Sequence, residues 1–206
     1  MKVIIIGDGG HSQVIQEMVI RQGHAIIALL DDKYENEQIV DGKIIAPISY
    51  YKQLLDGNVK VVVAVGNNET RKKIVRRLQL SDEFFLTVVD PTAFVSSTAL
   101  IGYGTVVMPN VVINANSVIK NHCIVNSGAV VEHDCRIEGF VHISPKATLT
   151  GNVSIGEGVH VGANATIIPS IKVLEWSIIG AGTTVIDTIP PYCTAVGNPA
   201  RLTTKL

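Results

Sequence analysis

The chain has 206 residues, enough for one or two domains, and 47% of them are apolar, which excludes an intrinsically disordered protein. Its 17 basic and 18 acidic residues nearly cancel, so nothing in the composition predicts nucleic acid or an anionic membrane surface as a partner. The three cysteines form no CxxC pair, which fits a reducing cytoplasm. The apolar runs are too short for a signal peptide or a membrane span.

The first 88 residues alternate short apolar runs with helical patterns, which predicts a small α/β domain with a parallel sheet. Strands are expected at 3–6, 26–30 and 59–65, and helices at 11–22 and 69–78. Gly7-Asp8-Gly9-Gly10 stands between the first strand and the first helix, where backbone N–H groups and the helix dipole can receive a phosphate. The domain is too short for a complete dinucleotide fold, so a mononucleotide fits better.

From about residue 89 onward the apolar pattern repeats every six residues. The sixteen positions in this series, from Val95 to Val185, are all aliphatic, and the positions two before them are mostly small. A helix cannot produce this period, whereas a triangular β-solenoid needs one inward aliphatic residue per short strand. We expect about five coils and a height of about 25 Å at ordinary strand spacing.

A solenoid has two open ends and flat faces that must be covered. We expect the α/β domain to cap one end, and the chain to leave the prism at Pro190-Pro191, because proline cannot continue a hydrogen-bonded ladder. A three-sided prism also suits a cyclic homotrimer.

Aliphatic-glycine pairs recur in the coils, at Ile101-Gly102, Ile155-Gly156, Val161-Gly162 and Ile179-Gly180, and the tail contains the segment Val196-Gly197-Asn198-Pro199-Ala200. This pattern resembles the left-handed β-helix acyltransferase superfamily, in which such a tail lies near the coenzyme A tunnel. Four further motifs occur in order along the chain: Gly7–His11, Leu30–Asp32, Val65–Asn68 with Arg71, and Glu132–Asp134. Together they are similar to the sialic acid O-acetyltransferase-like family of bacterial sugar acetyltransferases, which includes N-acetyltransferases of UDP-4-amino-sugars.

The resemblance implies a Rossmann-like nucleotide-sugar-binding domain at 1–88. It also implies a left-handed parallel β-helix acetyltransferase domain with a C-terminal tail at 89–206. The co-substrate would be acetyl-CoA, with no metal.

Acetyl transfer from a thioester requires a base for the attacking group and donors for the oxyanion that forms. His133 is the expected base, because a histidine is largely neutral at cytoplasmic pH and Glu-His-Asp interrupts a turn otherwise built from small residues. Either Asp134 or Glu132 could orient its other ring nitrogen, and the sequence leaves both open.

The family resemblance implies the remaining site residues. Acetyl-CoA is expected at His142, Gly151, Gly162, Gly180 and Pro199, with the Gly151 N–H donating to the thioester carbonyl. The nucleotide sugar is expected at Gly9, Gly10, His11, Asp31, Asp32, Gly66, Asn67 and Arg71. His122 and His160 are expected to be structural.

The activity predicted from these residues is N-acetylation of a UDP-linked 4-amino-sugar for a bacterial surface glycan or exopolysaccharide. Sialic acid-type O-acetylation and a non-catalytic nucleotide-sugar-binding trimer stay open as alternatives. A third alternative is a γ-class carbonic anhydrase, for which His122, His133, His142 and His160 would be the raw material of a metal site.

Overall fold

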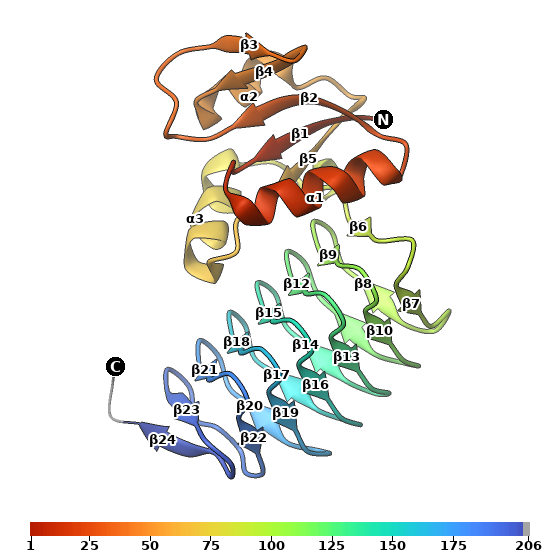
Figure 1. The fold of residues 1–206 in the computed structure, drawn as a ribbon, viewed down its shortest axis with the longest axis vertical. Helices are drawn as coiled ribbons and strands as arrows, with labels where there is room; N and C mark the ends of the chain where they lie inside the picture. Colours follow the sequence, from red (N-terminus) through yellow and green to blue (C-terminus); the bar gives the residue numbers. More distant parts are fainter. Residues whose placement is uncertain (204–206) are drawn as a thin grey trace.

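The computed structural model describes residues 1–203 and shows an α/β domain lying along one side of a β-solenoid (Figure 1). The sheet of the α/β domain has the strand order β3-β4-β2-β1-β5. Its elements are β1 Lys2–Ile6, α1 Gly10–Arg21, β2 Ala25–Leu30, β3 Gln38–Val40, β4 Lys43–Ala46, a 3-10 turn at Ile48–Tyr50, α2 Tyr51–Leu54, β5 Val59–Val63, α3 Asn68–Leu78 and a second 3-10 turn at Asp82–Phe84. The predicted strands and helices are confirmed, with ends shifted by one or two residues. None of the helices within residues 1–203 has the length and apolarity that a membrane crossing requires.

One edge of this sheet departs from the parallel arrangement that was expected. Strands β3 and β4 pair in antiparallel fashion through a tight turn in which Asp41 and Gly42 have φ values of 49° and 74°. Two successive left-handed residues are typical of a two-residue hairpin turn, and Asp-Gly is a common sequence for it. The Asp41-Gly42 dipeptide is therefore the feature of the sequence that indicates this hairpin.

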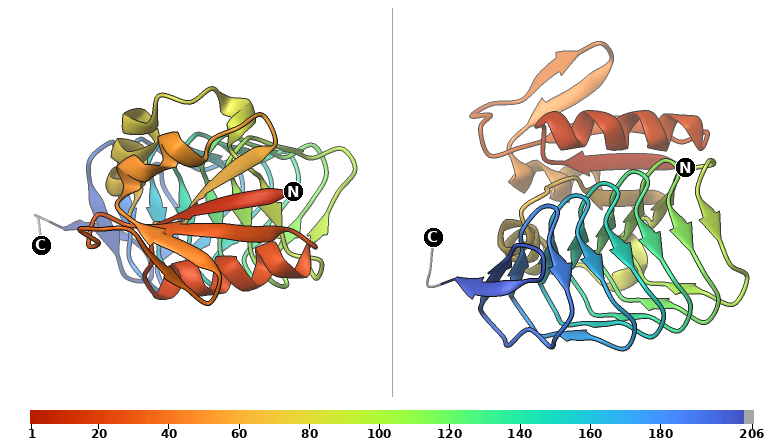
Figure 2. Two further views of the ribbon diagram at one scale, coloured as in Figure 1. Left: turned by 90° about the horizontal axis from the view of Figure 1, so that it is seen from above. Right: turned by 60° about the horizontal axis from the view of Figure 1, so that its bottom comes forward.

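The two faces of the sheet are covered by different helices. Val3 and Ile5 of β1 pack with α1, whereas Ile4 and Ile6 pack in the cluster that includes α2 and α3. The cluster around α1 extends to Val106 and Ile124 of the solenoid. Helix α1 therefore covers one face of the sheet and also contacts the solenoid, and the view from above in Figure 2 shows it beside the sheet, on the side opposite α2 and α3.

The solenoid is built from strands of two residues that recur every six residues and stack every 18, as in the pairing of Val112 with Val130. After β6 Val88–Val89 these strands are β7 Phe94–Val95, β8 Leu100–Ile101, β9 Val106–Val107, β10 Val112–Ile113, β11 Val118–Ile119, β12 Ile124–Val125, β13 Val130–Val131, β14 Arg136–Ile137, β15 His142–Ile143, β16 Thr148–Leu149, β17 Ser154–Ile155, β18 His160–Val161, β19 Thr166–Ile167, β20 Lys172–Val173, β21 Ile178–Ile179 and β22 Thr184–Val185. They form parallel sheets of five, six and eight strands, the last including β23 Thr194–Val196 and the antiparallel β24 Arg201–Thr203. The second residue of each two-residue strand belongs to the aliphatic series, and nearly all of these side chains are buried in one core, so the predicted solenoid is confirmed.

Two expectations about the ends of the solenoid were wrong. The α/β domain covers the outer face of the eight-stranded sheet and does not cap an end, because Val106 and Ile124 offer α1 an apolar surface there. Val95 and Ile101, the inward aliphatic residues of the first coil, are only half-buried, whereas those of the later coils are fully buried. The chain also stays in the prism beyond Pro190-Pro191, since β23 still pairs with β21. The prolines fall in a turn, where no ladder N–H is required.

The corner that leads from the five-stranded to the eight-stranded sheet carries residues with left-handed backbone angles, mostly with rings, that stack from coil to coil. This corner column begins at Gly104 and continues with His122, Phe140, Gly158, Trp176 and Tyr192. The rings of His122 and Phe140 stack with centroids 5.1 Å apart. Gly158 interrupts the rings, and Lys72 of α3 occupies the gap, with its Nζ 5.7 Å from the Phe140 centroid and 4.9 Å from that of Trp176.

Candidate active site

His133 lies between β13 and β14, at the corner where the chain passes from the six-stranded to the five-stranded sheet. Its side chain is 61% exposed, and its Nδ1 lies 2.8 Å from Oδ2 of Asp134. A carboxylate only accepts, so Nδ1 carries the proton and the Nε2 lone pair faces outward from this contact. Hydrogen bonds from His133 first and from Asn116 second lower the pKa of Asp134, which keeps the carboxylate ionised at neutral pH. Among the described residues, Asp134 is the carboxylate in contact with His133, and Glu132 makes no such bond.

Gly151 lies one coil beyond His133, directly against the imidazole. A Cβ at this position would come within 2.8 Å of both Cε1 and Nε2 of His133. The backbone N–H of the next residue, Asn152, donates to the His133 carbonyl at 2.9 Å, which fixes the distance between the two coils. Only glycine leaves the His133 ring its present place, so the two residues form one geometric unit.

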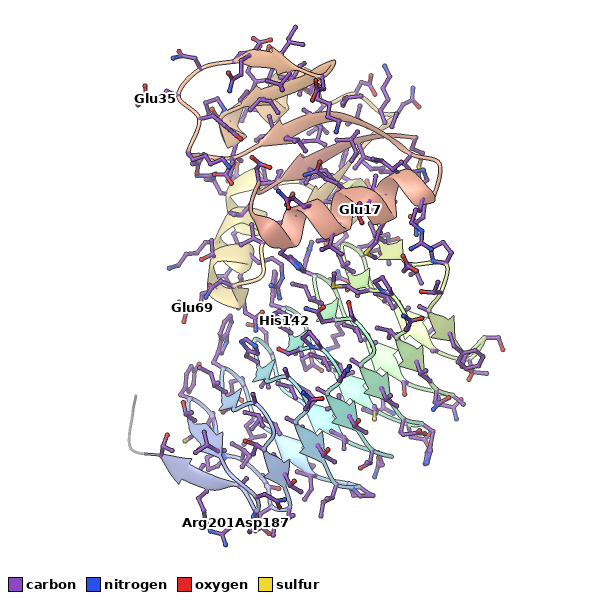
Figure 3. The ribbon with its side chains drawn as sticks, in the orientation of Figure 1. Glu17, Glu35, Glu69, His142, Asp187 and Arg201 are labelled. Carbon is purple, nitrogen blue, oxygen red and sulfur yellow. The ribbon has the colours of Figure 1, made fainter. Side chains whose placement is uncertain are left out.

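His142 begins β15 on the eight-stranded sheet and lies at the seam between the two domains, where Figure 3 labels it. Its Nδ1 lies 3.2 Å from the Gly66 carbonyl, which can only accept, and its Nε2 lies 3.1 Å from Nδ2 of Asn126, which can only donate. The amide of Asn126 is held in this orientation because its Oδ1 accepts from the Ser127 N–H at 2.8 Å. His142 is therefore a neutral imidazole protonated on Nδ1, and burial lowers its pKa to about 3.

Two further histidines complete a cluster at the seam. The rings of His142 and His160 stack with centroids 4.9 Å apart and an interplanar angle of 10°, and His11 lies 6.2 Å from His142. Burial lowers the pKa of His11 to about 4, and its buried Nε2 has no hydrogen-bond partner among residues 1–203. His160 was expected to be only structural; the spacing of 18 residues from His142, one coil, was the signal that placed the two rings together.

The proposed phosphate turn is open at the N-terminus of α1. Gly9 is the N-cap residue, and no atom lies within 4 Å of a Cβ built on Gly9 or Gly10. The Asp31 carboxylate accepts from the backbone N–H of Asp8 at 2.8 Å and from that of Lys33 at 3.0 Å. Asp31 therefore joins the turns that follow β1 and β2 and holds the open end of the helix in place.

Asp32, the next residue, is exposed and forms an ion pair of 2.7 Å with Arg77 of α3. The pair lies beside a hollow of about 160 Å³ that is also lined by Ile48, Ser49, Tyr51 and Lys52. Asn67, which follows β5, caps α3 by accepting from the Thr70 N–H at 2.9 Å. The ends of β1, β2 and β5 thus bring the expected nucleotide residues to one edge of the sheet, and Arg77 is an addition that the sequence did not indicate.

Arg71 is placed differently from the expectation that it lines an open pocket. Its side chain is 1% exposed, and its guanidinium donates to carbonyl oxygens of both domains, including those of Val65 and His122. The position of Arg71 on α3 explains the difference. Arg71 lies on the side of the helix that faces the seam between the two domains, whereas Arg76 of the same helix is exposed to solvent.

The remaining expected coenzyme residues lie in later coils. A Cβ on Gly162 would come within 2.6 Å of the Ala181 nitrogen, and one on Gly180 within 2.8 Å of the Val196 side chain, so both glycines allow close coil stacking. Pro199 is exposed in the turn between β23 and β24. Within residues 1–203 no three His, Cys, Asp or Glu side chains gather in a way that could hold a metal ion.

Comparison with known families agrees with both halves of this arrangement. Residues 2–78 match the model of the PglD N-terminal domain, and residues 134–169 and 152–187 match that of the bacterial transferase hexapeptide (six repeats). The curated UDP-N-acetylbacillosamine N-acetyltransferase of Bacillus subtilis (strain 168) is 44% identical over 109 residues. That match covers 52% of this chain and 50% of the relative, so the chain aligns with about half the length of that protein.

Two solved structures match along nearly the whole chain. PerB from Caulobacter crescentus, in complex with CoA and GDP-perosamine, is 32% identical, covers 98% of this chain and 97% of its own, and has a TM-score of 0.90. The acetyltransferase domain of PglB from Neisseria gonorrhoeae FA1090, in complex with acetyl coenzyme A, is 34% identical, covers 98% of both chains and has a TM-score of 0.87. The resemblance inferred from the motifs is confirmed, and this chain belongs to the family of hexapeptide-repeat sugar N-acetyltransferases that carry a PglD-type N-terminal domain.

Proposed function

We propose that the protein transfers the acetyl group of acetyl-CoA to the amine of a nucleotide-linked amino sugar, with a UDP-linked 4-amino-sugar as the acceptor. The observation that carries this proposal is the exposed His133, oriented by an ionised Asp134 and lying against Gly151. The names of the relatives support the reaction, and the curated Bacillus relative, at 44% identity, supports UDP over GDP.

The chemistry assigned to these residues is as follows. The amine nitrogen attacks the thioester carbonyl, the carbonyl oxygen gains negative charge, and the Gly151 N–H donates to it. Nε2 of His133 takes the proton that the amine loses, while Asp134 stabilises the imidazolium. The C–S bond then breaks, and the proton passes from His133 to the leaving thiolate. His142 takes no part as a base, because both of its ring nitrogens are engaged.

The nucleotide is proposed to bind at the edge of the α/β sheet, within residues 1–88. Its phosphates would lie over Gly9 and Gly10 at the N-terminus of α1, and its base or ribose near Asp32. The buried Nε2 of His11 would gain the hydrogen-bond partner it lacks, from a hydroxyl or phosphate of the sugar nucleotide. Acetyl transfer is assigned to residues 89–206, with Gly162, Gly180 and Pro199 along the coenzyme.

The site is proposed to be shared between protomers of a homotrimer. His133 lies at the corner between the five-stranded and six-stranded sheets, and His142 lies on the third sheet, which is the face opposite that corner. One protomer therefore cannot bring both histidines to one thioester. In a cyclic trimer the corner of one prism abuts a face of the next, which would unite them. The cytoplasm, where acetyl-CoA and nucleotide sugars are made, is the proposed compartment.

The test is to incubate the purified protein with acetyl-CoA and a panel of acceptors, and to follow thiol release and product mass. The panel contains UDP-4-amino-sugars, GDP-perosamine, UDP-GlcNAc and sialic acid. Turnover that requires a free amine on a UDP-sugar supports the proposal. Turnover only with GDP-perosamine would change the proposed nucleotide from UDP to GDP. Turnover only with sialic acid would change the acceptor atom from nitrogen to oxygen. If no acceptor causes thiol release, the proposed activity is rejected.

A further inference from the structure

Arg71 is a buried cation without a carboxylate partner among residues 1–203. Burial lowers its pKa, to about 10, so the guanidinium is still charged at neutral pH. An unpaired buried charge is costly unless its donors are satisfied, and here they are satisfied by backbone carbonyls and one amide oxygen. Burying the guanidinium costs solvation free energy, and the hydrogen bonds to these oxygens offset that cost.

The hydrogen bonds of Arg71 fall into two groups. On the α/β side, Nη1 donates to the carbonyls of Val65 and Gly66 at 3.0 and 3.2 Å, and Nη2 donates to Oδ1 of Asn68 at 2.8 Å. On the solenoid side, Nε donates to the His122 carbonyl and Nη2 to the Phe140 carbonyl, both at 2.9 Å. The planar guanidinium therefore ties the loop after β5 to two successive coils of the corner column.

The Gly66 carbonyl is the point where this network meets the acetyl-transfer site. It accepts from Arg71 on one side and from Nδ1 of His142, at 3.2 Å, on the other. No atom lies within 4 Å of a Cβ built on Gly66, so side-chain packing does not hold this peptide. Its direction depends on hydrogen bonds and on Asn67, which caps α3.

We propose that Arg71 is a positioning residue for the acetyl-transfer site: it fixes the Gly66 carbonyl, which in turn holds His142 as the Nδ1-protonated tautomer. With that tautomer, Nε2 accepts from Asn126 and the ring stays stacked on His160. Without it Nδ1 loses its acceptor, so the ring is free to turn, the donor of Asn126 alone opposes transfer of the proton to Nε2, and the coenzyme surface changes shape. The part of this inference that concerns acetyl transfer rests on the proposed function, whereas the tautomer does not.

The experiment compares Arg71→Lys with Lys72→Met in the full-length protein. Lysine keeps the charge but has one nitrogen and cannot reach both domains in the forked geometry of a guanidinium. Lys72→Met is the matched control, because Lys72 also joins α3 to the corner column, through Glu157 and two rings, but does not touch Gly66. Both variants loosen the same seam, and only the first releases the carbonyl.

Nitrogen-15 NMR of histidine-labelled protein reads the tautomer directly. We expect Arg71→Lys to shift the His142 ring nitrogens toward a mixture of tautomers, and Lys72→Met to leave them unchanged. Unchanged His142 signals in folded Arg71→Lys overturn the inference, as does the same change in both variants. If Arg71→Lys does not assemble, Asn68→Ala removes one acceptor of the guanidinium, and a smaller shift in the same direction is required.

A double-mutant cycle with His142→Ala gives the kinetic readout. Arg71→Lys is expected to lower kcat/KM for acetyl-CoA by about tenfold in the otherwise native protein, and by less than about twofold when His142 is already absent. An equal loss in both backgrounds means that Arg71 acts only through overall stability. If the native protein acetylates no nucleotide amino sugar, the proposed function fails, and the NMR result still decides the positioning role.

Discussion

Two histidines nine residues apart in the sequence, His133 and His142, have opposite environments. His133 is 61% exposed and has one ring nitrogen on an ionised carboxylate, which leaves the other ring nitrogen able to accept a proton. His142 lies at a domain seam with both nitrogens bonded to groups that cannot ionise, and burial lowers its pKa to about 3. Under the proposed function the same side chain would therefore serve proton transfer in one place and shape in the other, and the partners of the ring would decide which.

Replacement of His133 should have the largest effect on activity. We expect His133→Asn to lower kcat by about 10²- to 10⁴-fold, the usual contribution of a general base. Binding of acetyl-CoA and of the UDP-sugar, measured by calorimetry, should persist because the seam and the phosphate turn are untouched. Retained turnover would mean that His133 is not the general base.

Replacement of Asp134 should be next in size. Asp134→Asn keeps the shape but removes the charge, and its amide can present a donor to Nδ1, so we expect kcat to fall by about 100-fold. Glu132→Gln is the matched control, because Glu132 does not contact the ring, and it should lose less than about twofold. A larger loss for Glu132→Gln would move the orienting role to that residue.

Crowding the imidazole of His133 tests its geometry without changing its chemistry. Gly151→Ala places a methyl group within 2.8 Å of the ring, so we expect kcat to fall by about tenfold as the base is displaced. Gly139→Ala is the control, because its Cβ would meet only the Asn121 carbonyl at 3.4 Å. Equal activities of the two variants would show that the position of His133 is not critical.

The buried histidine should be visible in the pH dependence of stability. The folded pKa values of His142, His11 and His122 are about 3, 4 and 4, below the unfolded value of 6.5. Between pH 6.5 and 4 the unfolded chain binds protons that the folded protein does not, so stability falls as pH falls. Each such histidine contributes about 1.4 kcal/mol per pH unit.

The variant His142→Asn isolates one of these contributions. Its unfolding free energy, from denaturant titrations at several pH values, should decline less steeply below pH 6.5 than that of the native protein. Parallel pH profiles for the two proteins would show that His142 is not held neutral in the fold.

The solenoid could be predicted because its rule is local and repeated. Each aliphatic residue, such as Ile113 or Val131, meets the same interior as the one six residues before it, so the period alone gives the strands and their register. The corner proposed to be catalytic could be singled out for a related reason, since Glu132-His133-Asp134 breaks the repeat in the sequence itself.

The domain seam could not be predicted, because it joins residues far apart in the chain. In the sequence Arg71 is one of several basic residues on a helix that also contains Arg76 and Arg77. It is buried by contacts with carbonyls 51 and 69 residues away, and no local pattern records them. The antiparallel hairpin at Asp41-Gly42 is different, since its turn dipeptide is a local signal from which the hairpin could have been predicted.

The missing side chain at Gly158 has a consequence for how the molecule assembles. A solenoid presents nearly the same surface at each coil, so a domain resting on it could slip along by one step of about 4.8 Å with little change in apolar contact. The corner column breaks that equivalence, because Gly158 is the position within it that has a ring on the coil before and a ring on the coil after but none of its own, and Lys72 fits there between Phe140 and Trp176. A methyl group at Gly158 would come within 2.5 Å of the Trp176 ring. The gap at Gly158 thus determines which coils of the solenoid the α/β domain packs against.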